Sequence, residues 1–313
     1  MKMNRLILLA ILTFSCDRPD MNFKLSEITT LENIPAASGI GIHEKHMLII
    51  GDNSPYLYLL DHTAKPLSKI PIYPLDNYKD GEIAKSIKPD FEALELVKGK
   101  VDDEVLIFGS GSKSPQRDIF IHVTLAEQPV IKTYNLVSFY NQLRDNKILR
   151  GYELNIEAVA LYENKLMLFN RGKNLIFIYD YEEFLRFLNS KAPYPPPSVK
   201  ELELPKINGF VSGFSGATVI PETSTLIFTT SVEDTPNAYD DGEVLGSFIC
   251  MIDLDRLDEG VKHFLIEDRN QPMKIKVESV TVLNKISESK IEILLVTDSD
   301  GGESLLLKGH LIW

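Results

Sequence analysis

A short phrase recurs five times along this chain of 313 residues. Each copy opens with serine or glutamate, continues with a small residue and ends with an apolar one. The five opening residues are Ser38, Glu92, Glu157, Ser215 and Glu278. Successive copies start 54, 65, 58 and 63 residues apart. A period near 60 indicates one supersecondary unit repeated five times, which restricts the fold to architectures built from such units.

Each unit is predicted to contain four short strands. The runs are β-branched or aromatic and are bounded by Gly, Asn, Asp or Pro, as is typical of strands joined by turns. The second unit shows the pattern with predicted strands at Phe91–Val97, Glu104–Phe108, Asp118–Thr124 and Pro129–Leu136. Four strands per unit in five units predict an all-β fold.

The fifth unit has only three predicted strands, at Val277–Leu283, Glu292–Thr297 and Ser304–Ile312. The segment Lys24–Leu31 precedes the first unit and has no unit of its own. Pairing this segment with the last three strands would complete a ring and remove the free sheet edges. The sequence therefore predicts a five-bladed β-propeller that is closed by its N-terminal strand.

Two insertions interrupt the strands. Val137–Asp145 and Tyr181–Asn189 carry apolar residues at helical spacing, which predicts two short helices. No domain boundary is visible after the first residues, so we expect one propeller domain over residues 23–313, preceded by a tether at 17–22.

The first 16 residues have the organisation of a signal segment. Lys2 and Arg5 precede an apolar run that ends shortly before Cys16. The run is too short to cross a bilayer as a helix. A cysteine in this place resembles a bacterial lipoprotein signal, which implies lipidation of Cys16 and an extracytoplasmic location. Ordinary secretion and an uncleaved anchor are the alternatives.

Charge limits the partners. The chain has a formal net charge of −12, and removal of the signal segment would make it more negative. A surface this acidic argues against nucleic acid and against anionic lipid. We expect a monomer that contacts the membrane only through its anchor. Cys250 would then be the only other cysteine, in a strand-like run where a buried, inert thiol is expected.

The five opening residues are candidate metal ligands. In a propeller the innermost strands surround one central channel, so these side chains would converge. Three carboxylates in one place repel one another unless protons or a cation offset their charge. Oxygen ligands of this kind favour Ca²⁺ over Zn²⁺. The predicted ligands are Ser38, Glu92, Glu157, Ser215 and Glu278, and the alternative is a set of separate carboxylates without a metal.

This ring resembles that of the calcium-dependent apyrases, which are secreted five-bladed propellers. Their central Ca²⁺ is held by serine and glutamate side chains, one from each blade. The chain also resembles the bacterial propellers grouped as phytase- or esterase-like. The first resemblance implies that the five residues bind a central Ca²⁺, and neither fixes a reaction.

A second row of polar residues ends the second strand of each unit. Such positions lie at the mouth of the channel, where a rigid scaffold presents its loops. Arg117 lies nearby and, together with Arg171, has the geometry to bind a phosphate or carboxylate; the alternative is that Arg171 pairs with a neighbouring acid. The predicted substrate-binding residues are Asp52, Ser110, Arg117, Arg171, Thr230 and Asp298.

The sequence leaves three functions open. The first is a Ca²⁺-dependent hydrolase of phosphate or other esters that binds a small anionic substrate at the mouth. The second is a non-catalytic propeller with structural Ca²⁺ that binds a ligand or a protein. The third is a glycan-active enzyme, for which no pair of carboxylates can be assigned. The fold by itself does not decide among them.

Overall fold

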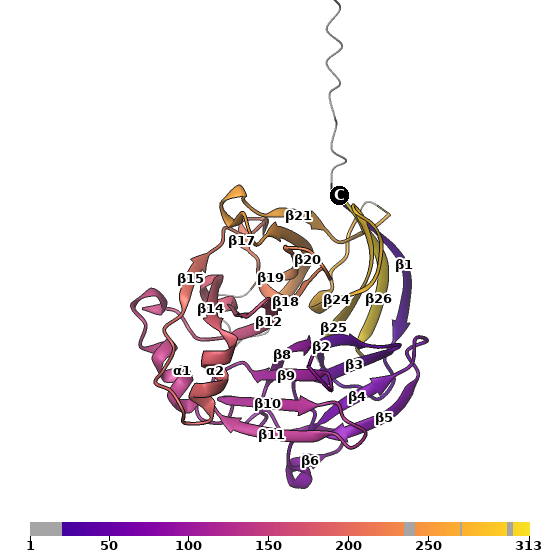
Figure 1. Cartoon of the computed structure of the whole chain (residues 1–313). Helices are drawn as coiled ribbons and strands as arrows, with labels where there is room; N and C mark the ends of the chain where they lie inside the picture. Colours follow the sequence, from indigo (N-terminus) through magenta and orange to yellow (C-terminus); the bar gives the residue numbers. More distant parts are fainter. Residues whose placement is uncertain (1–20, 235–241, 270, 299–302) are drawn as a thin grey trace, which may run out of the picture.

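The computed structural model describes residues 21–234, 242–269, 271–298 and 303–313. Five antiparallel sheets of four strands surround a central axis (Figure 1). The fold is therefore the all-β, five-bladed propeller that the sequence predicts. The lipidation prediction at Cys16 falls outside the described residues.

The blades follow one another along the chain, and each begins with its innermost strand. Blade 1 comprises β2 (Ala37–His43), β3 (His46–Gly51), β4 (Tyr56–Leu60) and β5 (Pro66–Pro71). Blade 2 comprises β8 (Phe91–Val97), β9 (Glu104–Gly109), β10 (Ile119–Thr124) and β11 (Val130–Asn135). Blade 3 comprises β12 (Ile156–Tyr162), β13 (Lys165–Asn170), β14 (Leu175–Asp180) and β15 (Ser198–Glu201). Blade 4 comprises β18 (Gly213–Val219), β19 (Thr225–Asp234), β20 (Glu243–Asp253) and β21 (Lys262–Leu265).

Blade 5 joins the two ends of the described chain. It is built from β24 (Lys276–Ser287), β25 (Lys290–Asp298), β26 (Leu305–Ile312) and β1 (Asn22–Thr30). Strand β1 pairs antiparallel with β26, from Asn22 opposite Ile312 to Thr30 opposite Leu305. The predicted closure by the N-terminal strand is confirmed, with β1 beginning two residues earlier than the predicted Lys24.

Both predicted helices are present. They are α1 (Val137–Arg144) after blade 2 and α2 (Tyr181–Leu188) inside blade 3. The Asp180 side chain caps α2 by accepting a hydrogen bond from the Glu183 N–H at 2.8 Å. The buried faces of the helices place Phe139 and Phe184 in the core between blades 2 and 3. Among the described residues, no helix is long and apolar enough to span a bilayer.

Short hairpins and 3₁₀ turns complete the chain. The hairpins pair β6 (Tyr78–Lys79) with β7 (Glu82–Ile83), β16 (Lys206–Ile207) with β17 (Phe210–Val211), and β22 (Glu267–Asp268) with β23 (Gln271–Pro272). The 3₁₀ turns are Leu75–Asn77, Lys147–Leu149, Arg171–Lys173 and Leu257–Glu259. The sequence analysis did not predict these hairpins, because two-residue strands carry no periodic signal.

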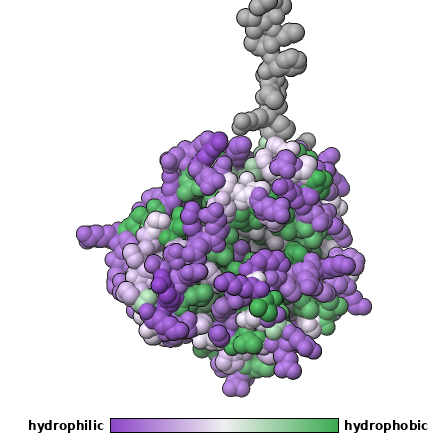
Figure 2. All heavy atoms as spheres, viewed as in Figure 1, coloured by the Kyte–Doolittle hydropathy of each residue, from purple (hydrophilic) through white to green (hydrophobic). Residues whose placement is uncertain are grey.

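The core is divided into one apolar layer between each pair of adjacent blades. In β3, for example, Leu48 and Ile50 pack toward blade 2, whereas Met47 and Ile49 pack toward blade 5. This alternation follows from the two-residue period of a strand. Both faces of every blade are therefore covered by neighbours, and hydrophilic residues cover most of the outer rim (Figure 2).

Candidate functional site: the acidic mouth of the channel

The five predicted ring residues occupy equivalent backbone positions. In each innermost strand the register against the second strand shifts by one residue at a β-bulge. The residue passed over by each shift is Ser38, Glu92, Glu157, Ser215 or Glu278. A bulge redirects a side chain out of the regular alternation of its strand. The repeated phrase is therefore the sequence signature of five bulges, one in each strand around the channel (Figure 1).

The two serines of this ring are engaged inside the protein. Ser38 is buried and donates its hydroxyl hydrogen to the Phe91 carbonyl of blade 2 at 2.5 Å. Ser215 is buried and donates to Thr229 Oγ1 at 3.1 Å. Both hydroxyls retain lone pairs, but their hydrogens tie neighbouring strands together.

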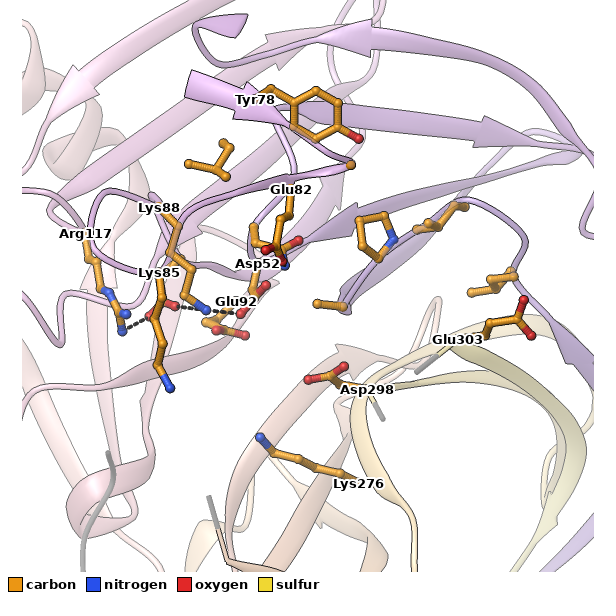
Figure 3. A pocket seen from close by; sticks show the side chains of 18 of the residues that line it. Asp52, Tyr78, Glu82, Lys85, Lys88, Glu92, Arg117, Lys276, Asp298 and Glu303 are labelled. Atoms are coloured by element: carbon orange, nitrogen blue, oxygen red, sulfur yellow. Dashed lines mark hydrogen bonds and ion pairs between the residues drawn. The ribbon is translucent and has the colours of Figure 1, made fainter. Parts of the chain in front are cut away.

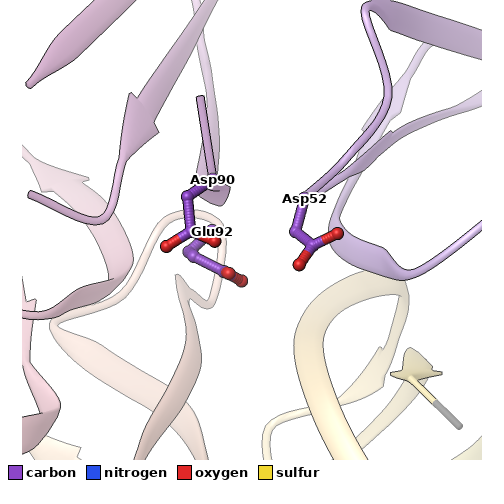
Figure 4. A group of neighbouring side chains, drawn as sticks. All are labelled: Asp52, Asp90 and Glu92. Atoms are coloured by element: carbon purple, nitrogen blue, oxygen red, sulfur yellow. The ribbon is translucent and has the colours of Figure 1, made fainter. Parts of the chain in front are cut away.

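The Glu92 carboxylate lies beside two other acids. One oxygen each of Asp52, Asp90 and Glu92 lie within 4.8 Å of one another. Asp52 faces Asp90 and Glu92 across the gap between blades 1 and 2 (Figure 4). Burial raises the pKa of Glu92 well above its ordinary range, and the charges of Asp90, Glu157 and Asp52 raise it further. Burial also raises the pKa of Asp52, although the Lys88 ammonium opposes that rise.

Basic side chains enter this cluster of three acids. Lys88 forms ion pairs with Asp52 and, at 2.8 Å, with Asp90 Oδ1. Arg117 Nη1 contacts Asp90 Oδ2 at 2.5 Å and donates to Ser112 Oγ at 2.7 Å. Arg117, predicted to bind substrate, is thus held in place by Asp90.

Glu157 and Glu278 belong to a second network at the same mouth. Arg171 lies 3.7 Å from Glu157 Oε2 and 3.2 Å from Glu233 Oε2. Lys276 Nζ lies 3.2 Å from Glu233 Oε1 and 3.0 Å from Glu278 Oε1. Arg171 therefore pairs with neighbouring acids, as the alternative to substrate binding proposed.

Unequal pKa shifts distinguish the acids of the second network. Burial raises the pKa of Glu157 to about 7, with Arg171 opposing the rise and the charge of Glu278 adding to it. Burial would also raise the pKa of Glu233, but Arg171 and Lys276 hold it below its ordinary value. Glu157 is therefore the carboxyl of this pair that exchanges a proton near neutral pH.

Two buried carboxylate oxygens at the mouth lack a donor. Among the described residues nothing hydrogen-bonds to Asp52 Oδ1 or Glu278 Oε2. An unsatisfied buried acceptor is costly, and an ionised carboxylate can only accept. These oxygens are suited to a bound cation or an ordered water.

A polar cavity of about 790 Å³ opens beside the cluster of three acids. Asp52, Arg117, Glu92 and Glu157 line it, and Lys276 and Asp298 reach it from blade 5 (Figure 3). The β6–β7 hairpin contributes Tyr78 and Glu82 to its wall.

Three predicted substrate residues lie elsewhere. Ser110 is buried and donates a hydrogen bond to Asp90 Oδ2, so it stabilises the Asp90 carboxylate without lining the cavity. Thr230 is buried, with its hydroxyl 3.9 Å from Cys250 Sγ inside blade 4. Arg171 points into the second network and not into the cavity wall. Cys250 is buried as expected, and burial raises the pKa of its thiol.

Several residues of the site were not predicted from the sequence. Asp90, Asn155 and Lys276 each lie two positions before a ring residue and line the cavity. Asp90 adopts a left-handed backbone conformation with φ of 56°, which is uncommon outside glycine and clusters at functional sites. Of the five positions two residues upstream of the phrases, only these three are polar, and the other two are Ala36 and Gly213. Lys88 lies outside these positions and carries no such signal, whereas Glu233 follows the predicted strand end at Thr230 and was expected near the mouth.

Fold and site together define the class. The protein is a five-bladed β-propeller whose channel mouth is lined by acidic side chains that pair with lysine and arginine side chains. The chain belongs to a family of unknown function, DUF6929, whose model matches residues 33–311. No curated protein matches the sequence.

The chain is similar to several solved structures of low sequence identity. Glutaminyl cyclase from Myxococcus xanthus is 11% identical, with a TM-score of 0.44 and coverage of 95% of this chain and 99% of that one. A mutant α-L-arabinanase from Cellvibrio cellulosa is 9% identical, with a TM-score of 0.48 and coverage of 90% and 92%. An exo-1,5-α-L-arabinanase from a bovine ruminal metagenomic library is 8% identical, with a TM-score of 0.48 and coverage of 92% and 95%. The resemblance to apyrases and to phytase- or esterase-like propellers stays a prediction.

Proposed function

We propose that this chain is a lipid-anchored, extracytoplasmic propeller that holds one Ca²⁺ at the acidic mouth and hydrolyses a phosphate ester or another anionic ester in the adjoining cavity. The observation that carries the proposal is the convergence of Asp52, Asp90 and Glu92, with Asp52 Oδ1 buried and without a donor among the described residues.

The residues at the mouth fit a hard divalent cation. All candidate ligand atoms are carboxylate oxygens, which Ca²⁺ prefers over nitrogen and sulfur. Burial and the neighbouring carboxylates raise the pKa of Glu92 and Asp52, and a bound cation would oppose that rise. Asp52, Asp90 and Glu92 would hold the ion, and Glu278 would approach it with its free oxygen. A bound Ca²⁺ would polarise an ester oxygen and orient water.

The protein side chains around the cavity have separate tasks. Lys88, Arg117 and Lys276 supply positive charge for an anionic group, and the contacts of Arg117 with Asp90 and Ser112 fix its guanidinium. Glu157 lines the cavity and accepts a hydrogen bond from the Asn155 amide at Oε1, at 2.6 Å. With a pKa of about 7, the Glu157 carboxyl can take and return a proton near neutral pH.

A panel of phosphatase, nucleotidase and esterase substrates tests this function, with Ca²⁺ and with a chelator. We expect turnover that requires Ca²⁺ and falls about 100-fold or more in Glu157→Gln. Glu182→Gln, an exposed substitution on α2, is the matched control. Activity that resists the chelator, or that survives Glu157→Gln unchanged, would refute the assignment.

A non-catalytic, ligand-binding propeller is the second candidate. Lys88 already pairs with both Asp52 and Asp90, so the protein supplies part of the charge that a metal would supply. This candidate predicts no turnover on any substrate of the panel. It also predicts that Ca²⁺ stabilises the fold without changing ligand binding in the cavity.

The anchor would leave the acidic mouth facing away from the membrane. Strand β1 begins at Asn22, opposite Ile312, and Ile312 pairs with Lys290 at the β24–β25 turn. That turn is at the far end of β24 from Lys276, which lines the cavity. Cys16→Ser should move the protein from the membrane fraction to the soluble fraction, and unchanged fractionation would count against lipidation.

The partners follow from charge. An excess of acids makes nucleic acid and anionic lipid poor partners. We therefore propose a monomer whose ligand is a small anionic molecule, bound where basic side chains concentrate at the cavity.

A further inference from the structure

The innermost strands lead from the acidic mouth to a second cavity at the opposite end of the channel. The cavity has a volume of about 770 Å³. All five innermost strands contribute to it with residues that follow their bulges, in the stretches 40–42, 95–97, 161–162, 217–219 and 280–282.

The wall of this cavity combines apolar and polar residues, with the apolar ones in the majority. Ile40, Leu161, Val219, Val280 and Val282 line it. Leu161, Val219 and Val282 are only partly buried, so they keep apolar surface in contact with the cavity. Covering such surface with the apolar part of a ligand is favourable.

The Glu95 carboxyl group of β8 lines this second cavity. Glu95 Oε1 accepts a hydrogen bond from the Leu161 N–H at 3.3 Å, and no other described residue donates to this carboxyl group. Within the described part of the chain, no lysine, arginine or histidine forms an ion pair with Glu95. Burial raises the pKa of Glu95 to about 8, and the bond from Leu161 only partly opposes the rise. An ionised carboxylate accepts several hydrogen bonds, so most of the capacity of Glu95 is unused.

The charges around the rim that have no ion-pair partner among the described residues are all negative. Glu163, Glu222 and Asp255 line the cavity and form no ion pair with another described residue. Lys98 is the basic residue of the lining, and its ammonium lies 2.6 Å from Asp103 Oδ2. The uncompensated charge is therefore negative, which attracts cations and repels anionic amphiphiles.

We propose that this second mouth binds an organic ammonium ion, with its apolar body against the channel wall and its ammonium group on the Glu95 carboxylate. The site is separate from the acidic mouth, and the proposal does not depend on Ca²⁺ or on hydrolysis there. A primary alkylammonium combines the three properties that the cavity selects: a positive charge, several N–H donors and an apolar chain.

Isothermal titration calorimetry with hexylammonium chloride tests the proposal. The titration is run at about pH 9, where Glu95 is mostly ionised and an alkylamine is still charged. We expect saturable binding to the wild-type protein, binding at least tenfold weaker to Glu95→Gln, and weaker binding of the uncharged analogue hexanol. Glu288→Gln, a 94% exposed glutamate side chain in the β24–β25 turn, should bind hexylammonium like the wild type.

The remaining outcomes are also decisive. Equal affinity of wild type and Glu95→Gln, or no saturable binding to the wild type, would overturn the proposal. Displacement of hexylammonium by Ca²⁺ would also overturn it, because the site would then be one for inorganic cations. If Glu95→Gln folds poorly, a crystal of the wild type soaked in hexylammonium serves instead, and an ammonium away from Glu95 refutes the assignment.

Discussion

At the scale of single residues, Glu95 makes stability depend on pH. Its folded pKa is about 8 against an ordinary value of 4.5. Between these values the folded chain holds a proton that the unfolded chain releases, so the free energy of unfolding falls as pH rises toward 8. In Glu95→Gln we expect this decrease in the free energy of unfolding to be smaller than in the wild type, by an amount on the order of 2 kcal/mol. Urea unfolding at a series of pH values measures it, and an identical pH dependence in both proteins would contradict it.

Lys88 separates the metal hypothesis from a purely ionic mouth. Its ammonium lies where Asp52 and Asp90 approach each other. Lys88→Gln would remove the positive charge that competes with a metal ion for Asp52 and Asp90. Ca²⁺ should therefore bind about tenfold more tightly, which corresponds to about 1.4 kcal/mol. Inorganic phosphate should bind more weakly to the same variant.

Calorimetric titrations of Ca²⁺ and phosphate measure both effects, with Lys88→Arg as the charge-preserving control. Unchanged Ca²⁺ affinity in Lys88→Gln would mean that these acids do not form the metal site.

At the scale of elements, the bulges fix how closely the innermost strands approach one another. A Cβ atom added at Gly216 would lie 2.5 Å from the Ser279 Cα of blade 5. Backbone cannot yield there, so Gly216→Ala should lower the free energy of unfolding by about 1–3 kcal/mol. At Gly41 the nearest atom is the Leu94 Cδ2 at 2.9 Å, the end of a side chain.

Gly41→Ala is therefore the matched control and should cost less. Chemical denaturation of the two variants compares them. If both variants lose the same free energy of unfolding, contact between the backbones of neighbouring innermost strands does not determine how closely these strands pack.

Sequence patterns predicted the elements better than the contacts between them. The repeat predicted the blades because every unit must bury both faces, which imposes the same strands five times. It also predicted the bulge residues, since the bulge recurs with the phrase. The partners of those residues were not predictable in the same way. Lys88 and Glu233 come from a loop and from a strand end, where no periodicity links them to the acids that they contact.

At the scale of the whole molecule, closure depends on β1. This strand covers the edge of β26 and places Phe23 in the core between blades 4 and 5. Deleting residues 1–31 should open the ring and lower the melting temperature by 10 °C or more, as expected for the loss of several kcal/mol. Deleting residues 1–20 alone is the control and should leave the melting temperature unchanged. A melting temperature that is the same for both deletions would contradict closure by β1.

The closure was predictable because the last repeat lacks a strand and the first segment lacks a unit. The channel has two mouths of different chemistry, and this asymmetry was not predicted. It arises because residues before the bulges carry charge, such as Asp90 and Lys276, whereas those after them are mostly apolar.

The central claim is that the acidic mouth holds Ca²⁺, and a crystal structure of the protein grown with Ca²⁺ tests it most directly. We predict an anomalous peak at about 2.3–2.6 Å from oxygens of Asp52, Asp90 and Glu92, with the Lys88 ammonium displaced from between the two aspartates. A mouth without such a peak, in which Lys88 still bridges Asp52 and Asp90 at saturating Ca²⁺, would contradict the claim.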